Sequence, residues 1–155
     1  MPSTVFTSCR QAVLADSRSD MAESQIDLAT ESDIVRARQT ARSRAQQLGF
    51  GPIDQSRIAT AVSELARNVL RYATGGQGRV LIRDLQAEQG RAGIEVIVQD
   101  DGPGMDDPEA AMRDGYTTGR GMGLGLPGTK RLMDEMVLDS ALGKGTTVTI
   151  RKWKR

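Results

Sequence analysis

The chain has 155 residues, a formal net charge of +1, one cysteine and no histidine. A chain of this length suits a single domain with a sizeable core. Without histidine, imidazole bases, Ser-His-Asp triads and phosphohistidine chemistry are excluded, so catalysis must use carboxylates, amides, Arg or Lys, backbone dipoles or a hard metal ion. The near-neutral charge and the 3% content of aromatic residues argue against a nucleic-acid-binding protein.

The sequence also bears on compartment and domain organisation. No apolar run is long enough to span a membrane, the N-terminal residues are too polar for a secretory signal, and Cys9 has no second cysteine for a disulfide. These features predict a cytoplasmic protein without a membrane partner. Residues 1–24 are rich in serine and lack a hydrophobic period, which predicts a flexible tail, disordered or with a short helix, before one domain over residues 25–155.

The domain opens with a strand and a helix. Residues 25–30 predict a short edge strand. Thr30 with Asp33, or alternatively Ser32, can cap a helix that reaches about Leu48. The arginines along this helix indicate a solvated face, with a docking surface for an acidic partner as the alternative.

A second helix follows Gly51-Pro52 and is expected to end at Gly75-Gly76. Its apolar residues, spaced by three and four, form one stripe: Ile58, Val62, Leu65, Val69 and Tyr72. Such a stripe packs on a sheet and leaves the rest of the helix available for other contacts.

The second half of the chain predicts strands with one helix between them. The expected elements are strands at 79–85 and 93–99, a glycine-rich loop at 100–128, a helix containing 131–136, and strands at 137–141 and 146–153 with a turn at 143–145. Helices followed by strands with hairpin-length connections predict an α+β two-layer sandwich rather than an alternating parallel fold.

A first polar cluster lies on the second helix. Glu64 and Asn68 are four residues apart, hence on one face, and Arg71 extends this row. A carboxylate beside an amide oxygen suits a Mg²⁺ ion that keeps several waters and bridges to phosphate oxygens. Considered alone, Glu and Asn on a helix are usually surface residues, so an ordinary solvated helix surface is the alternative.

A second cluster follows the strand at 93–99. Asp100 stands at the strand end, where a carboxylate can accept a hydrogen bond from an exocyclic amine such as that of adenine. Gly102 and Gly104 permit positive φ and a close approach of backbone to a ligand. A plain Asp-Gly-Pro-Gly turn is the alternative interpretation.

A third cluster is the glycine-rich run from Gly119 to Gly128. Alternating glycines allow backbone N–H groups to converge on phosphate oxygens, and Leu126-Pro127 is expected to start a helix whose positive end assists. A Walker A loop does not fit, because the Gly-Lys-Ser/Thr sequence is absent. A dinucleotide fingerprint fits poorly, because no strand precedes the run.

The order and spacing of the three clusters resemble the N, G1 and G2 boxes of the GHKL ATP-binding superfamily, which includes gyrase, histidine kinases and MutL. Gly143–Thr149 is similar to the terminal Gly-Thr strand of that superfamily. The resemblance covers about residues 25–153. It implies a two-layer α/β sandwich of the Bergerat type, with a mixed, mostly antiparallel sheet covered on one face by about three helices.

Within that superfamily, the chain is similar to the small anti-sigma-factor kinases, and above all to the RsbT-type switch kinases of stress signalling. The segments that carry this resemblance are Ser63–Asn68, Asp114–Thr118, Gly125–Gly128 and Lys130–Glu135. Residues 1–24 have no place in the shared core. Histidine kinases usually carry Asn at the position of Asp101, which leaves two adjacent carboxylates as adenine acceptors, and the register favours Asp100.

The resemblance implies a role for each site residue. Asp100 would accept a hydrogen bond from the adenine amino group, with Thr146 close by, and the backbone at Gly102 and Gly104 would follow the base and ribose. Asn68 would bind Mg²⁺. Glu64 would act as general base. The expected phosphate contacts are Arg71, Thr117, Thr118, Arg120, Gly121, Gly123 and Gly125, several of them in a short ATP lid at residues 105–120.

The resemblance also implies a function. It points to a serine/threonine protein kinase that uses Mg-ATP to phosphorylate a STAS-domain antagonist and, when released, activates a PP2C-type phosphatase in a partner-switching stress response. The alternatives are an anti-sigma factor whose main output is sequestration of a sigma factor, and an ATP-binding interaction module without catalysis. A gyrase-like clamp is disfavoured, because the chain has no transducer domain.

Overall fold

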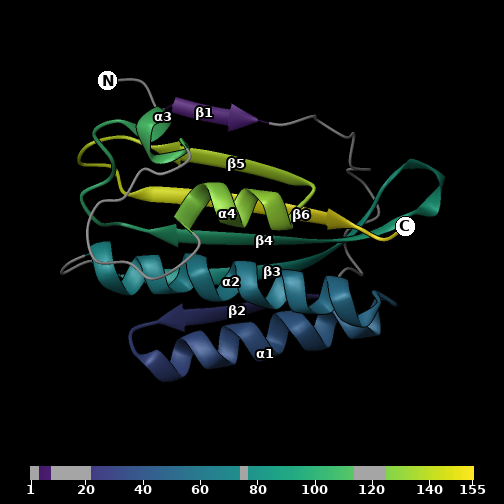
Figure 1. Cartoon of the computed structure of the whole chain (residues 1–155). Helices are drawn as coiled ribbons and strands as arrows, with labels where there is room; N and C mark the ends of the chain where they lie inside the picture. Colours follow the sequence, from purple (N-terminus) through teal and green to yellow (C-terminus); the bar gives the residue numbers. More distant parts are fainter. Residues whose placement is uncertain (1–3, 8–21, 74–76, 114–124) are drawn as a thin grey trace.

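The computed structural model describes residues 22–73, 77–113 and 125–155, together with the backbone of residues 4–7. Six strands form one sheet in the order β1-β5-β6-β4-β3-β2, and every described pairing is antiparallel. Figure 1 shows helices α1, α2 and α4 on one face of this sheet. The predicted α+β two-layer sandwich is therefore confirmed.

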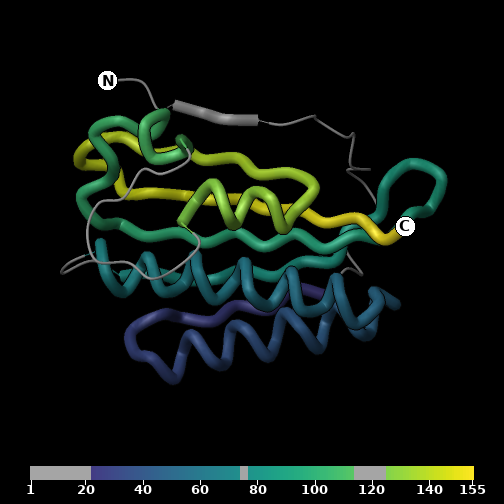
Figure 2. The backbone as a smooth tube through the Cα atoms, in the orientation of Figure 1, coloured from purple at the N-terminus to yellow at the C-terminus, as the bar shows by residue number. Residues whose placement is uncertain are grey.

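The strands are β1 (Thr4–Thr7), β2 (Glu23–Leu28), β3 (Gly78–Gln86), β4 (Ala92–Asp100), β5 (Glu135–Ser140) and β6 (Thr146–Trp153). The helices are α1 (Glu31–Gln47), α2 (Pro52–Tyr72), α3 (Pro108–Ala111) and α4 (Gly125–Leu132). Figure 2 follows the chain from the edge strand β2 through the α1–α2 pair and back into the sheet at β3. None of the described helices is long and apolar enough to cross a membrane.

Most predicted elements are confirmed, and the ends of two helices differ. The helix expected at 131–136 is wrong in its extent: α4 ends at Leu132, and Glu135 already belongs to β5, where it pairs with Arg151. The second helix ends at Tyr72, and Gly75-Gly76 lie outside the described residues.

The N-terminal residues also differ from the expectation of a flexible tail that is disordered or contains a short helix. Residues Thr4–Thr7 form β1, which pairs with β5 at the sheet edge. The physical reason is that a free edge of β5 offers unpaired backbone groups to a segment rich in β-branched and aromatic residues. Residues 8–21 lie outside the described part of the chain.

Helix α1 starts where the sequence predicts it, at the cap formed by Thr30 and Asp33. Oδ2 of Asp33 accepts hydrogen bonds from the backbone N–H groups of Ala29 and Thr30, at 2.8 and 2.9 Å. These two bonds lower the pKa of Asp33, because they stabilise its ionised form. The cap thereby fixes the turn between β2 and α1.

The core lies between the helices and one face of the sheet. Alternate residues of each strand face the helices, and the largest fully buried ones include Ile82, Ile94, Ile150 and Leu138. The apolar stripe of α2, with Ile58, Val62 and Leu65 buried, packs against them. Burial of these side chains provides the main force that holds α2 over the sheet.

The opposite face of the sheet carries a row of alternating charges. The row runs across five strands in register: Glu23, Arg83, Glu95, Arg151 and Glu135. Glu95 sits in the middle, with its carboxylate 2.7 Å from Arg151 and 3.6 Å from Arg83. Because Glu95 is buried and paired on both sides, the two arginines depend on its charge.

We expect Glu95→Gln to lower the free energy of unfolding by about 3 kcal/mol, because it leaves two half-buried arginines without their shared partner. Glu23→Gln, at the exposed end of the same row, should cost less than about 1 kcal/mol. Urea denaturation of both variants measures the difference. Equal losses would show that the row acts as an ordinary surface ion pair.

Candidate active site

Asp100 is the last residue of β4 and lies between two neighbouring strands. Its register partners are Gly78 on β3 and Thr146 on β6. The alternation of β4 places Asp100 on the same side of the sheet as the buried Val96 and Val98, which is the side that the helices cover. The carboxylate therefore stands at the end of the strand, under the helical layer.

The environment of Asp100 disfavours its charge. Burial raises the pKa of this carboxyl group above its ordinary value, and the neighbouring charge of Asp101 acts in the same direction. Backbone hydrogen bonds from Gly102, at 2.9 Å, and from Thr146 lower the pKa and offset part of this effect. The result is a partly desolvated acceptor in a fixed orientation.

Asp101 has a different position. It is exposed, its carboxylate accepts a hydrogen bond from the backbone N–H of Gln77, and its own N–H donates to the carbonyl of Gln77 at 3.1 Å. Both bonds hold the residue that follows β4 beside the residue that precedes β3. The geometry thus favours Asp100 over Asp101 as the acceptor for a base, in line with the register of the motif.

A second hydroxyl, which the sequence analysis did not single out, stands beside Thr146. Oγ of Ser140 lies 2.8 Å from Oγ1 of Thr146 and accepts a hydrogen bond from the backbone N–H of Met105 at 2.9 Å. Ser140 thereby ties the chain after β4 to the β5–β6 hairpin. The predicted hairpin places Ser140 opposite Thr146, so the sequence contains a signal for this contact.

The two glycines of the second cluster have protein backbone as their nearest neighbours. A Cβ at Gly102 would lie 2.7 Å from Cα of Ala73, at the end of α2. A Cβ at Gly104, where φ is +75°, would lie 2.0 Å from the carbonyl oxygen of Ala141. Glycine is thus required here so that the chain after β4 can pack against α2 and the β5–β6 turn; contact with a nucleotide stays a prediction.

Helix α2 carries the first cluster on the face that its apolar stripe leaves free. Oε1 of Glu64 lies 3.1 Å from Nη1 of Arg67, and the glutamate side chain is only 14% exposed. Asn68 is half-buried one turn further along, and Arg71 is exposed near the helix end. Arg67 is not among the predicted site residues, although its i, i+3 spacing from Glu64 provides the signal for this pair.

The third cluster is described only at its end. Gly125 is the first residue of α4, which confirms the predicted helix start at Leu126-Pro127. The predicted phosphate contacts Thr117, Thr118, Arg120, Gly121 and Gly123 lie outside the described residues, as does part of the expected lid. Their roles remain predictions.

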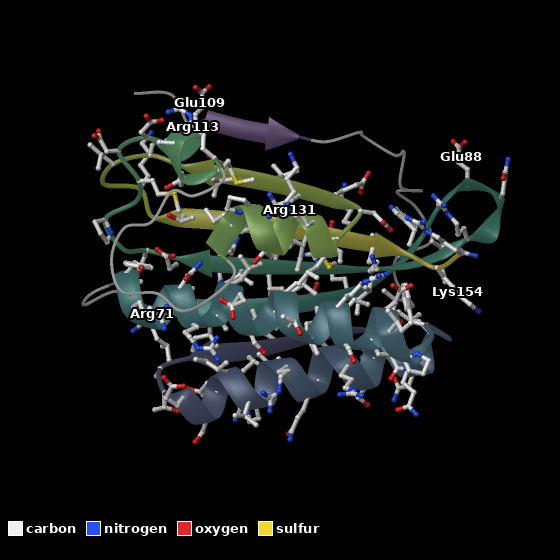
Figure 3. The ribbon with its side chains drawn as sticks, viewed as in Figure 1. Arg71, Glu88, Glu109, Arg113, Arg131 and Lys154 are labelled. Atoms are coloured by element: carbon white, nitrogen blue, oxygen red, sulfur yellow. The ribbon has the colours of Figure 1, made fainter. Side chains whose placement is uncertain are left out.

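The described parts of the three clusters meet at one end of the molecule. Figure 1 shows the end of β4, the end of α2 and the start of α4 on the left of the view. In Figure 3, Arg71 is labelled at this end, whereas Glu88 and Lys154 are labelled at the opposite one. Residues that are distant in the chain, such as Asn68 and Gly125, are thereby placed around one region between α2, α4 and the sheet.

This arrangement offers single polar groups rather than a set of metal ligands. Within the described residues, no group of three or more acidic or cysteine side chains could hold a metal ion. The amide oxygen of Asn68 could hold an ion together with the oxygens of a bound phosphate. That combination suits Mg²⁺, which favours phosphate oxygens and retained waters over an all-protein cage.

We expect Gly104→Ala to destabilise the protein by about 3 kcal/mol or more, because the new Cβ would collide with the carbonyl of Ala141. The matched control is Gly143→Ala, where φ is +78° and nothing lies within 4 Å. This control should cost about 1 kcal/mol, from the backbone conformation alone. Thermal and urea denaturation compare the two, and similar losses would contradict the close-packing explanation.

The raised pKa of Asp100 predicts a pH dependence of stability. The folded protein binds this proton more tightly than the unfolded chain, whose ordinary pKa is 3.8, so the contribution of Asp100 is greatest below pH 3.8 and is lost as the pH rises through the folded pKa. The free energy of unfolding of the wild type minus that of Asp100→Asn should therefore fall as the pH rises from about 4 toward neutrality. Urea denaturation across this range measures it, and a constant or rising difference would refute the assignment.

Comparisons with known proteins agree with this geometry. The sequence profile of the histidine kinase-like ATPase domain family matches residues 28–152. The chain is 49% identical to the serine/threonine-protein kinase RsbT of Bacillus subtilis (strain 168) over 133 residues, which are 86% of this chain and 98% of that protein. It is 31% identical to the anti-sigma F factor of Priestia megaterium over 121 residues, covering 75% of this chain and 81% of that one.

Among solved structures, the RsbU and RsbW domains of Rv1364c from Mycobacterium tuberculosis share the fold, with a TM-score of 0.56 and 20% identity, over 88% of this chain and 33% of that one. The family profile covers most of the chain, and the RsbT similarity extends over almost the whole relative. The chain therefore belongs to the histidine kinase-like ATPase domain family, within its group of RsbT-like serine/threonine kinases.

Proposed function

We propose that this protein uses Mg-ATP to phosphorylate a serine or threonine of a STAS-domain antagonist and, once released, binds and activates a PP2C-type phosphatase. The observation that carries the proposal is the convergence of Asp100, the Glu64–Asn68 face of α2 and the start of α4 in a chain 49% identical to a serine/threonine kinase. The partner-switching arrangement is supported by the similarity to both RsbT and anti-sigma F factors.

Asp100 binds the adenine ring of ATP in this proposal. A desolvated carboxylate whose backbone hydrogen bonds fix its orientation is a good acceptor for an exocyclic amino group. Thr146 stands beside it, and its hydroxyl is already placed by Ser140 at 2.8 Å. Guanine carries a carbonyl oxygen where adenine carries its amino group. That oxygen would stand against the carboxylate of Asp100, acceptor against acceptor, so the arrangement favours adenine over guanine.

The phosphates lie between α2 and α4 in this proposal. Bound Mg-ATP supplies the phosphoryl group and the metal charge that neutralises it. Asn68 offers an amide oxygen to the ion, and Arg71 offers a cation close to the solvent. Gly125 opens α4, whose eight residues direct the positive end of the helix toward this region.

Glu64 is the proposed general base. A chain without histidine needs a carboxylate for this task, and phosphoryl transfer requires only that one group orients the hydroxyl nucleophile and accepts its proton. Arg67 holds Oε1 of Glu64 at 3.1 Å, so the second oxygen is the one directed to the substrate hydroxyl. The low exposure of the side chain limits competition from water.

An anti-sigma factor is the second candidate function, because anti-sigma F factors share 31% identity with the chain. The kinase is preferred, since the RsbT similarity is higher and covers 98% of that relative. Sigma-factor sequestration as the main output would be revealed by a stable complex with a sigma factor that forms without transfer of phosphate to any protein.

We expect Glu64→Gln to retain ATP binding and to lower the rate of phosphoryl transfer by about 100-fold or more, because the proton acceptor is lost while the shape is kept. Transfer of γ-labelled phosphate to purified STAS-domain proteins of the same organism, with mass spectrometry of the modified residue, provides the measurement. Glu88→Gln is the matched control, since Glu88 is an exposed glutamate at the opposite end of the molecule (Figure 3).

Two outcomes would contradict the proposal. Full transfer by Glu64→Gln would remove the proposed base. Absence of transfer from the wild-type protein to every STAS-domain protein tested, under conditions where ATP binds, would refute the substrate class.

A further inference from the structure

Lys152 is a buried lysine that the candidate active site does not use. Its side chain is 7% exposed, and the alternation of β6 places it on the helix-facing side, with Val148 and Ile150. An ammonium group removed from water is costly unless polar groups replace the solvent. The groups that surround Lys152 therefore indicate what it holds in place.

Three elements of the fold meet at this ammonium group. Nζ donates a hydrogen bond to the backbone carbonyl of Leu132, the last residue of α4, at 2.9 Å. A carboxylate oxygen of Asp134, between α4 and β5, lies at 3.7 Å, and one of Asp54, in the first turn of α2, lies at 3.8 Å. A lysine in this position satisfies a free carbonyl and stabilises the negative end of the helix.

Asp134 makes this connection rigid. Its Oδ2 accepts a hydrogen bond from the backbone N–H of Trp153 at 2.7 Å, and its own N–H donates to the carbonyl of Arg151 at 3.0 Å. Lys152 therefore joins the end of α4 to the sheet itself rather than to a free loop. The same contact links α4 to α2 through Asp54.

The other end of α4 is the end that faces the active site. The helix has eight residues, so Gly125 lies about 12 Å from the anchored end. Oγ1 of the fully buried Thr129 donates to the carbonyl of Gly125 at 2.9 Å, which tightens this first turn. A short helix that is fixed at one end and packed along its length sets the position of its other end.

We propose that Lys152 is a positioning residue for phosphate binding: by holding the C-terminal end of α4 against α2 and the sheet, it fixes Gly125 relative to Asn68. The inference rests on the proposed function, which assigns Gly125 and Asn68 to the phosphates of ATP. Along β6, Lys152 is roughly 20 Å from Thr146, so it is remote from the adenine end of the site. Its effect is therefore confined to the phosphate end.

The test compares two ligands on the same protein. Lys152→Met removes the hydrogen bond and the charge but keeps the length of the side chain. The dissociation constants for Mg-ATP and for adenosine are measured on the variant and the wild type. Partial unfolding raises the apparent dissociation constants of both ligands by the same factor. The ratio of the two constants is therefore insensitive to a purely structural loss.

We expect Lys152→Met to reduce the preference for Mg-ATP over adenosine by about tenfold, and to slow phosphoryl transfer by a further factor of about 10, because the phosphates are misplaced. Lys152→Arg, which keeps a charged donor, should recover most of the preference. Arg151→Met is the matched control: it breaks the buried pair with Glu95 on the other face of the same strand, and should leave the preference unchanged.

The outcomes separate this inference from the proposed function. An unchanged preference in Lys152→Met overturns the inference while leaving the phosphate site intact. A wild-type protein that binds Mg-ATP no more tightly than adenosine overturns the phosphate site itself. If Lys152→Met does not fold, Asp54→Asn takes its place, with a smaller fall in the preference expected and an unchanged preference as the contrary result.

Discussion

The register of β4 between β3 and β6 is the constraint on which the candidate active site depends. It places Asp100 opposite Gly78 and Thr146, and it directs the even-numbered residues of the strand toward the helices. A shift by one residue would turn Asp100 to the other face of the sheet, together with the apolar side chains that form the core. The same pairing that buries Val96 therefore also delivers the carboxylate to the helical side, and the stability of the core specifies the position of the site.

That position has a cost to the folded state, because burial raises the pKa of Asp100 above that of the same group in an unfolded chain. A residue selected for stability alone would not be a carboxylate here. The surroundings limit the cost without removing it: backbone hydrogen bonds from Gly102 and Thr146 favour the charged form, and glycine at 102 lets the chain approach closely enough to donate one of them. A carboxylate in surroundings that disfavour its charge, within a fold whose other residues suit their positions, is typical of a functional site.

The sequence predicts those elements whose signals are local. The Thr30–Asp33 cap and the stripe on α2 depend on neighbours within one or two turns, and both helices form as expected. The sequence predicts a helix that includes Glu135, a residue type that favours helices, whereas its pairing with Arg151 on β6 places it in a strand. The predicted hairpin already places Ser140 opposite Thr146. The role of Lys152, by contrast, depends on contacts with two helices, so no local pattern could reveal it. The clusters at Glu64, Asp100 and Gly125 can be predicted from the sequence because each is a short motif. That they lie near one another is seen only in the folded structure.

The absence of histidine links these observations to the chemistry. In the proposed mechanism, a chain with the histidine kinase-like ATPase fold but no imidazole activates its nucleophile with a carboxylate, Glu64. A carboxylate is effective only where water is limited and its geometry is held. Both conditions depend on α2: its packing keeps Glu64 largely covered, and Arg67 fixes one oxygen. Because α2 contacts α4 through Asp54, Lys152 and the carbonyl of Leu132, the proposed base and the proposed phosphate end of the site are positioned by one connected set of contacts. In this mechanism the precision of phosphoryl transfer depends on the packing of α2 against α4 as well as on the reacting side chains.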